Sequence, residues 1–308
     1  MKHYIRPVLI PKKTADLVFG TIDIETYSQS NGGEFIPYCA TSYYDGDQFF
    51  AYTNDHYTTL VGRKRTVITD VIMILLYNLR DHMKARGQRS VILYAHNLSS
   101  FDGYFILKAC ANHNIKLDIL KRDTEIFFIK CKIDGISFEF RCSLLLLRQG
   151  LDKCAKSFQV DLTKLPMDHD WISADRLFYV GVTPFSGGRI IHLRDYVLKY
   201  CINDCIILYR ILLVFQAKIE EFGLSLATNT YSIPGLAFRA FKQKYLAPKE
   251  VVNLGMAKSM EAFIRDGYYG GRTEVFRAYV GGGTGYYYDV KGMYAQAMKK
   301  SLPCGTPR

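Results

Sequence analysis

The sequence predicts an α/β protein. Three observations carry this prediction: short segments that alternate apolar and polar residues, longer segments with helical spacing between them, and glycine turns at their ends. The alternation extends over roughly the first 220 residues, and the full length of 308 residues predicts about two domains. Hydrophobic residues make up 49% of the chain and charged residues 22%, which is typical of globular proteins.

Strands are expected where apolar and polar residues alternate, and hairpins where two such segments flank an Asp-Gly turn. In chain order, these segments are 16–25, 41–53 with its turn at Asp45-Gly46, 90–95, and 125–132 with 136–141 around Asp134-Gly135. Helices are expected where apolar residues recur every three or four positions, and a glycine is a common helix end. In chain order, these are 67–86 before Gly87, 102–112, 151–158, and 195–222 before Gly223.

The pattern changes after residue 222. A less regular stretch contains Pro234 and Pro248, and a segment rich in glycine and tyrosine follows at 267–288. We therefore expect the chain to divide into a leader at 1–15, a domain at 16–222, a connector at 223–265 and a second segment at 266–308.

Composition limits the classes of function. Forty Lys and Arg residues against 29 Asp and Glu residues give a net charge of +11, which favours an anionic partner such as nucleic acid. No apolar run approaches the ~18 residues of a membrane span, and the first seven residues do not resemble a secretory signal, so we expect no membrane partner. Eight cysteines without Cys-x-x-Cys spacing predict reduced thiols rather than a disulfide scaffold or a thiol metal site. Five histidines lack paired spacing and are expected to be surface or hydrogen-bonded residues: His82, His96, His113, His169 and His192.

Two short motifs place carboxylates at the ends of predicted strands. Asp23 and Glu25 are two residues apart, so both project from one face of their strand. The loop after the strand at 90–95 supplies Asn97, Phe101 and Asp102. Taken alone, the first pair also fits a solvated strand end, and Asp102 also fits the N-cap of the following helix.

A third motif completes a constellation of four carboxylates. Tyr200 and Asp204 are one helical turn apart, so they share a face of the long helix; alone, Asp204 also fits the rim of its buried stripe. If Asp23, Glu25, Asp102 and Asp204 meet, they repel one another and require divalent cations. Oxygen ligands suit Mg²⁺ or Mn²⁺, and two such ions are a common arrangement for phosphodiester hydrolysis. Tyr200 is then placed to orient the attacking water.

This ordered set resembles the motifs of the four-carboxylate 3′–5′ exonucleases that carry a tyrosine in the third motif. The resemblance implies a ribonuclease H-like exonuclease domain, a mixed sheet flanked by helices, over residues 16–222. It implies that Asn97 and Phe101 hold the single-stranded 3′ end. Ser143-Leu144 resembles a further single-strand-binding element, and Lys164 resembles the lysine that helps to hold the scissile phosphate.

The second segment resembles the start of a family B DNA polymerase palm, within the protein-primed branch found in small phages and in mitochondrial linear plasmids. Tyr268-Tyr269-Gly270-Gly271 with Arg272 matches the Tyr-x-Gly-Gly element that contacts the template. Asp289-Val290-Lys291-Gly292-Met293-Tyr294 resembles the first polymerase motif, in which Asp289 matches a metal ligand and Tyr294 a residue that stacks under the incoming nucleotide. Gly292, Ala295 and Cys142 depart from the family pattern.

The resemblance implies a DNA replication enzyme with metal-dependent proofreading activity. Its expected partners are a single-stranded 3′ end, primer-template DNA and a separate terminal priming protein, and its expected location is the mitochondrion. Because the chain ends at Arg308, before any second palm carboxylate motif, we expect its polymerase site to be incomplete. Two alternatives stay open: a DNA-binding remnant without catalysis, and a stand-alone RNA-trimming exonuclease.

Overall fold

The computed structural model describes residues 3–8, 19–28, 33–61, 64–228, 230–249, 252–253, 258–267, 270, 273–277, 279 and 281–301. The chain divides into two compact units. The larger comprises residues 9–241, and the smaller comprises residues 1–8 with 242–308.

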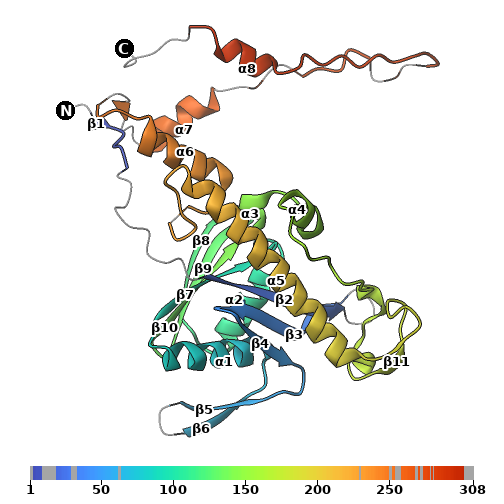
Figure 1. Ribbon diagram of the computed structural model, residues 1–308. Coiled ribbons are helices and arrows are strands. Elements are labelled where there is room, and N and C mark those ends of the chain that lie inside the picture. The colour runs from blue at the N-terminus through green and yellow to red at the C-terminus, as the bar shows by residue number, and fades with distance from the viewer. Residues whose placement is uncertain are drawn as a thin grey trace. The chain divides into compact units, whose positions relative to one another are not determined.

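A seven-stranded mixed sheet forms the centre of the larger unit (Figure 1). Its strand order is β4 (Asp47–Tyr52), β3 (Phe35–Tyr44), β2 (Phe19–Ser28), β7 (Ser90–Ala95), β10 (Ile136–Cys142), β9 (Glu125–Ile133) and β8 (Leu117–Arg122). β7 is parallel to both β2 and β10, whereas the outer pairs are antiparallel. Parallel neighbours require a crossover connection, and the segment from β2 to β7 provides one.

Helices cover both faces of this sheet. α1 (Val71–Ala85) and α2 (Asp102–Asn112) pack with Ile22 and Ile24 of β2 in one core cluster. α4 (Leu151–Ser157) and the long α5 (Leu193–Glu220) pack on the opposite face, where Phe19 of β2 contributes to their cluster. Because successive strand residues point to opposite faces, Asp23 and Glu25 share the α5 face with Phe19.

The remaining elements of the larger unit are short. They are the hairpin β5 (Tyr57–Val61) and β6 (Lys64–Ile68), α3 (Leu144–Leu147), η1 (His169–Trp171), η2 (Ala174–Arg176), and the hairpin β11 (Val180–Val182) and β12 (Ile190–His192). α6 (Ile233–Lys244) runs across the boundary between the units.

The predicted α/β class with a mixed sheet flanked by helices is confirmed, and so are both Asp-Gly hairpins. The helix expected at 67–86 is wrong at its start, because Val67 and Ile68 belong to β6. Asp70 explains the difference: its carboxylate accepts the amide hydrogens of Ile72 and Met73, at 3.0 and 3.1 Å, and so caps a helix that begins at Val71. The strand expected at 16–25 is described from Phe19 and continues to Ser28.

The smaller unit contains β1 (His3–Tyr4) paired with β13 (Val252–Asn253), together with α7 (Lys258–Asp266) and α8 (Met293–Met298). Every described residue between 273 and 301 is exposed, including Asp289 and Tyr294. Across the residues that the structure describes, no helix has the length and apolar character needed to cross a membrane.

Candidate active site

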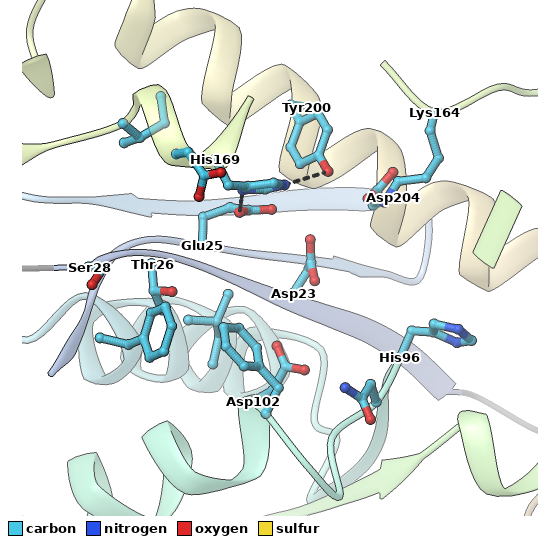
Figure 2. Close-up of a pocket in the computed structure, with 16 residues that line it drawn as sticks. Asp23, Glu25, Thr26, Ser28, His96, Asp102, Lys164, His169, Tyr200 and Asp204 are labelled. Carbon is cyan, nitrogen blue, oxygen red and sulfur yellow. Dashed lines mark hydrogen bonds and ion pairs between the residues drawn. The ribbon is translucent and has the colours of Figure 1, made fainter. Parts of the chain in front are cut away.

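A cavity of about 410 Å³ gathers the residues of the exonuclease-like motifs (Figure 2). The motif residues that line it are Asp23, Glu25, Asn97, Phe101, Asp102, Lys164, Tyr200 and Asp204. They come from a strand, the loop after a neighbouring strand, a returning loop and a helix. The fold therefore brings together side chains that are up to 181 residues apart, from Asp23 to Asp204.

Strand β2 supplies the two central carboxylates. Ile22 and Ile24, at 1% and 2% exposure, anchor its other face in the core, which turns Asp23 and Glu25 toward α5. Glu25 is buried, and Asp23 is partly exposed toward the cavity. In Figure 2 the Asp23 carboxylate lies between those of Asp102 and Asp204.

The turn after β7 positions Asp102 at the first residue of α2. Asn97 has a φ of 72°, a left-handed conformation that asparagine adopts more readily than most residues. Gly103 follows Asp102, and a Cβ atom at this glycine would lie 2.5 Å from the carbonyl oxygen of Leu98. Only glycine therefore allows α2 to begin this close to the turn, and Asp102 is consequently buried at 2% exposure.

Helix α5 supplies Tyr200 and Asp204 from the opposite side of the cavity. Lys164 reaches Asp204 from the loop after α4, with Nζ 2.7 Å from Oδ2. The same ammonium group lies 5.5 Å from the centre of the Tyr200 ring. Lys164 thus places a positive charge beside Asp204, and the same charge opposes the raised pKa values of Asp23 and Glu25.

Burial and mutual repulsion make the acids hard to ionise. Burial and the charge of Asp204 raise the pKa of Asp23 from 3.8 to about 7. Burial, followed by the charge of Asp23, raises the pKa values of Glu25 and Asp102 well above their ordinary range. Burial also raises the pKa of Asp204, although Lys164 opposes the shift.

Two of these carboxylates have an oxygen without a partner. Oδ1 of Asp102 and Oδ1 of Asp204 are buried, and neither accepts a hydrogen bond from any described residue. An excess of buried anionic oxygen over donors is the condition that a bound divalent cation relieves. The donor set therefore fits a divalent metal ion.

His169 is a cavity residue that sequence reasoning placed only among surface or hydrogen-bonded histidines. Its Nδ1 lies 3.5 Å from Oε2 of Glu25, and its Nε2 lies 3.5 Å from the Tyr200 hydroxyl (Figure 2). His96 also lines the cavity, and its Nδ1 lies 3.1 Å from Oγ of Ser143. The motifs gave no signal for His169, because the loop that carries it has no fixed spacing to β2 or α5.

Several predicted residues lie elsewhere. Ser143 is fully buried, and it and Leu144 are not among the residues that line the cavity. Gly270, Asp289 and Tyr294 belong to the smaller unit, where each is exposed. The predicted template-contacting residues Tyr268, Gly271 and Arg272 lie outside the described residues.

Comparison with known proteins identifies similar chains. The family described as DNA polymerase type B, organellar and viral, matches residues 82–188 and 191–308. A probable DNA polymerase of Agaricus bitorquis is 25% identical over 342 residues, covering 99% of this chain and 42% of the relative. A probable DNA polymerase of Neurospora intermedia is 30% identical over 257 residues, covering 70% of this chain and 25% of the relative.

Among solved structures, Phi29 DNA polymerase complexed with single-stranded DNA superposes with a TM-score of 0.53 at 17% identity, covering 84% of this chain and 40% of that one. Its complex with primer-template DNA and incoming nucleotide gives a TM-score of 0.54 with the same coverage. At this identity the likeness concerns the fold. The chain spans less than half the length of these relatives.

Proposed function

This chain belongs to the type B DNA polymerases of organelles and viruses, as its motifs predicted, and we propose that its carboxylate cavity removes nucleotides from the 3′ end of single-stranded DNA. The convergence of four acids, Tyr200 and Lys164 in one cavity carries the proposal. Removal of a mispaired 3′-terminal nucleotide would serve as a proofreading step for a DNA polymerase. The activity lies in the larger unit, within the proposed exonuclease domain at 16–222.

The cavity is suited to Mg²⁺ or Mn²⁺. Asp23, Glu25, Asp102 and Asp204 are the residues that would hold the ions, because they supply oxygen ligands without matching donors. Bound there, two ions would supply an activated water and stabilise the leaving oxygen of a phosphodiester. Because burial raises the pKa values of these four acids, cations bound in the cavity would favour their ionised forms.

The remaining side chains of the cavity would bind the DNA and orient the water and the phosphate. Burial and nearby acids raise the pKa of Tyr200 above its ordinary value, so its hydroxyl stays protonated and able to donate toward a water or phosphate oxygen. Burial lowers the pKa of Lys164, but its pairing with Asp204 outweighs this, so the side chain stays cationic beside the phosphate. Asn97 and Phe101 also line the cavity, where the Phe101 ring would stack on a base. Ser143 supports the ring of His96 rather than facing the cavity itself.

The palm residues complete the proposal for the whole protein. The connector at 223–265 and the segment at 266–308 would lead into a polymerase domain in which Tyr268, Gly270, Gly271 and Arg272 contact template. Asp289 would hold a polymerase metal ion and Tyr294 the incoming nucleotide. We further propose a separate terminal priming protein, and a mitochondrial linear plasmid or phage-like element as the setting.

A nuclease assay tests the proposal. A single-stranded DNA and a primer with a mismatched 3′ end, both labelled at the 5′ end, are incubated with Mg²⁺ or Mn²⁺. We expect stepwise shortening by the wild type and by Asp118→Ala, an exposed residue of β8, and none by Asp23→Ala/Glu25→Ala. DNA that is bound but left intact by the wild type would contradict the proposal. Faster shortening of a matched RNA strand would indicate an RNA-trimming enzyme instead.

A further inference from the structure

A thiol lies directly behind the central carboxylates. Asp23, Glu25 and Cys201 each offer one ligand atom, and these three atoms all lie within 4.8 Å of one another. Cys201 follows Tyr200 on α5 and is completely buried, so its sulfur faces β2 and β3 rather than solvent. This spacing matches three ligands around a single metal ion.

The sulfur is already oriented toward the carboxylate. The Cys201 thiol donates to Oδ2 of Asp23 at 3.4 Å, and the Thr41 hydroxyl donates to the sulfur at 3.1 Å. The second contact holds the sulfur from the side of β3. A donor behind a metal ligand also fixes the direction of that ligand.

The ligand type selects the cation. Mg²⁺ prefers oxygen and is a poor partner for sulfur, whereas Zn²⁺ and Cd²⁺ bind thiolate and carboxylate together. The surroundings demand positive charge, because Asp102 and Asp204 each bring an unpartnered buried oxygen to the same cavity. Cys201 therefore distinguishes this site from one built of oxygen alone.

We propose that Asp23, Glu25 and Cys201 form a binding site for one thiophilic divalent cation of the Zn²⁺ class. Binding releases the thiol proton to solvent and forms a sulfur–metal bond. The cation competes with Mg²⁺ for Asp23 and Glu25, so Zn²⁺ is an inhibitor of the proposed nuclease. The inference goes beyond the proposed function, because cation binding is measured without DNA and without cleavage.

Cd²⁺ is the probe, because a thiolate–cadmium bond adds a charge-transfer absorption in the ultraviolet. All seven cysteines among the described residues are buried, and Cys304 lies outside them, so every protein carries Cys304→Ser. The test variant is Cys201→Ser. The matched control is Cys205→Ser, because Cys205 lies one turn further along α5, is equally buried and also contacts Thr41, at 3.4 Å, but does not belong to the three-ligand group.

The parent protein and Cys205→Ser are expected to gain the absorption at one equivalent of Cd²⁺, and Cys201→Ser to lack it. Competition with a chromophoric chelator is expected to show Zn²⁺ affinity reduced about 100-fold or more in Cys201→Ser, since loss of an outer-shell partner alone costs 10- to 100-fold. Absorption that persists in Cys201→Ser, or is absent from the parent, would overturn the inference. If Cys201→Ser does not fold, Glu25→Gln is titrated with Cd²⁺ and read at the cadmium–thiolate absorption: a weakened titration would show that Glu25 and the thiol share one ion, and an unchanged titration would overturn the inference.

The nuclease assay separates the two proposals. Mg²⁺-dependent cleavage without a cadmium–thiolate absorption would leave the proposed function standing and reject the thiol site. Absorption by a protein that cleaves no DNA would support the thiol site and reject the nuclease.

Discussion

Asp23→Asn is expected to stabilise the folded chain when no divalent cation is present. Burial and the charge of Asp204 raise the pKa of Asp23 from 3.8 to about 7. One pKa unit corresponds to about 1.4 kcal/mol, so ionising Asp23 in the folded chain costs about 4 kcal/mol. Asparagine keeps the shape of the neutral acid and avoids this cost.

The stabilisation by Asp23→Asn is expected to increase with pH. The folded-state pKa of Asp23 is above its unfolded value, so the folded chain holds the extra proton. Its contribution to stability is fully present below pH 3.8 and is lost as the pH rises through about 7. The gain from Asp23→Asn should therefore be near zero at about pH 4 and reach roughly 2–4 kcal/mol at about pH 8, the lower value allowing for proton sharing with Glu25 and Asp102.

Urea unfolding in the presence of a chelator measures this gain across the pH range, with the exposed Asp118→Asn as the control. Saturating Mg²⁺ is expected to reverse the order of stability, because the ion stabilises the form that binds it. A gain under about 1 kcal/mol at pH 8, or an equal gain at both ends of the pH range, would refute the electrostatic reasoning.

Three further substitutions test other parts of the structure. Lys164→Met leaves Asp204 buried without its cation. Because the Lys164 side chain is 36% exposed, we expect urea unfolding to show a free energy of unfolding lower by only about 1–2 kcal/mol, and we expect slower cleavage. Phe101→Ala removes a stacking surface and is expected to raise KM for single-stranded DNA about tenfold, the effect of roughly 1–3 kcal/mol, with kcat little changed; a change in kcat alone would contradict this role. Arg141 is 2% exposed and donates hydrogen bonds to Glu139 and to two backbone carbonyls, so Arg141→Met is expected to lower the stability of the folded chain by about 3–5 kcal/mol. Thermal melting should show this loss, whereas the exposed Arg65→Met should melt like the wild type.

Local patterns predicted the elements that carry the acids. Alternation about Ile22 and Ile24 placed Asp23 and Glu25 on one strand face, and α2 begins at Asp102 as expected. These predictions succeeded because periodicity and turn chemistry act over a few residues. The exposed edge strand β8 was missed, because its mixture of lysine, aspartate and arginine hides the alternation.

The prediction that the four acids meet in one cavity had a different basis. No local rule brings Asp23 and Asp204 together; the order of the motifs along the chain supplied that expectation. His169 escaped it because it belongs to no motif, and Cys201 because it occupies an unspecified position between Tyr200 and Asp204. Their roles depend on where a loop returns and on which face of α5 meets β2, and only the three-dimensional structure gives these relations.

Assays of this chain test the two units differently: cleavage tests the larger unit, and DNA synthesis tests the smaller one. Each acid of the cavity is held by a packed element of the larger unit, so a failure of cleavage there would count directly against the proposed chemistry. Asp289 and Tyr294 are exposed in the smaller unit, and Tyr287 beside them is 92% exposed. Side chains without packing cannot hold a nucleotide at fixed geometry. Lack of DNA synthesis by this chain alone would therefore leave the family membership untouched, whereas the packed acids of the carboxylate cavity allow a direct test of cleavage.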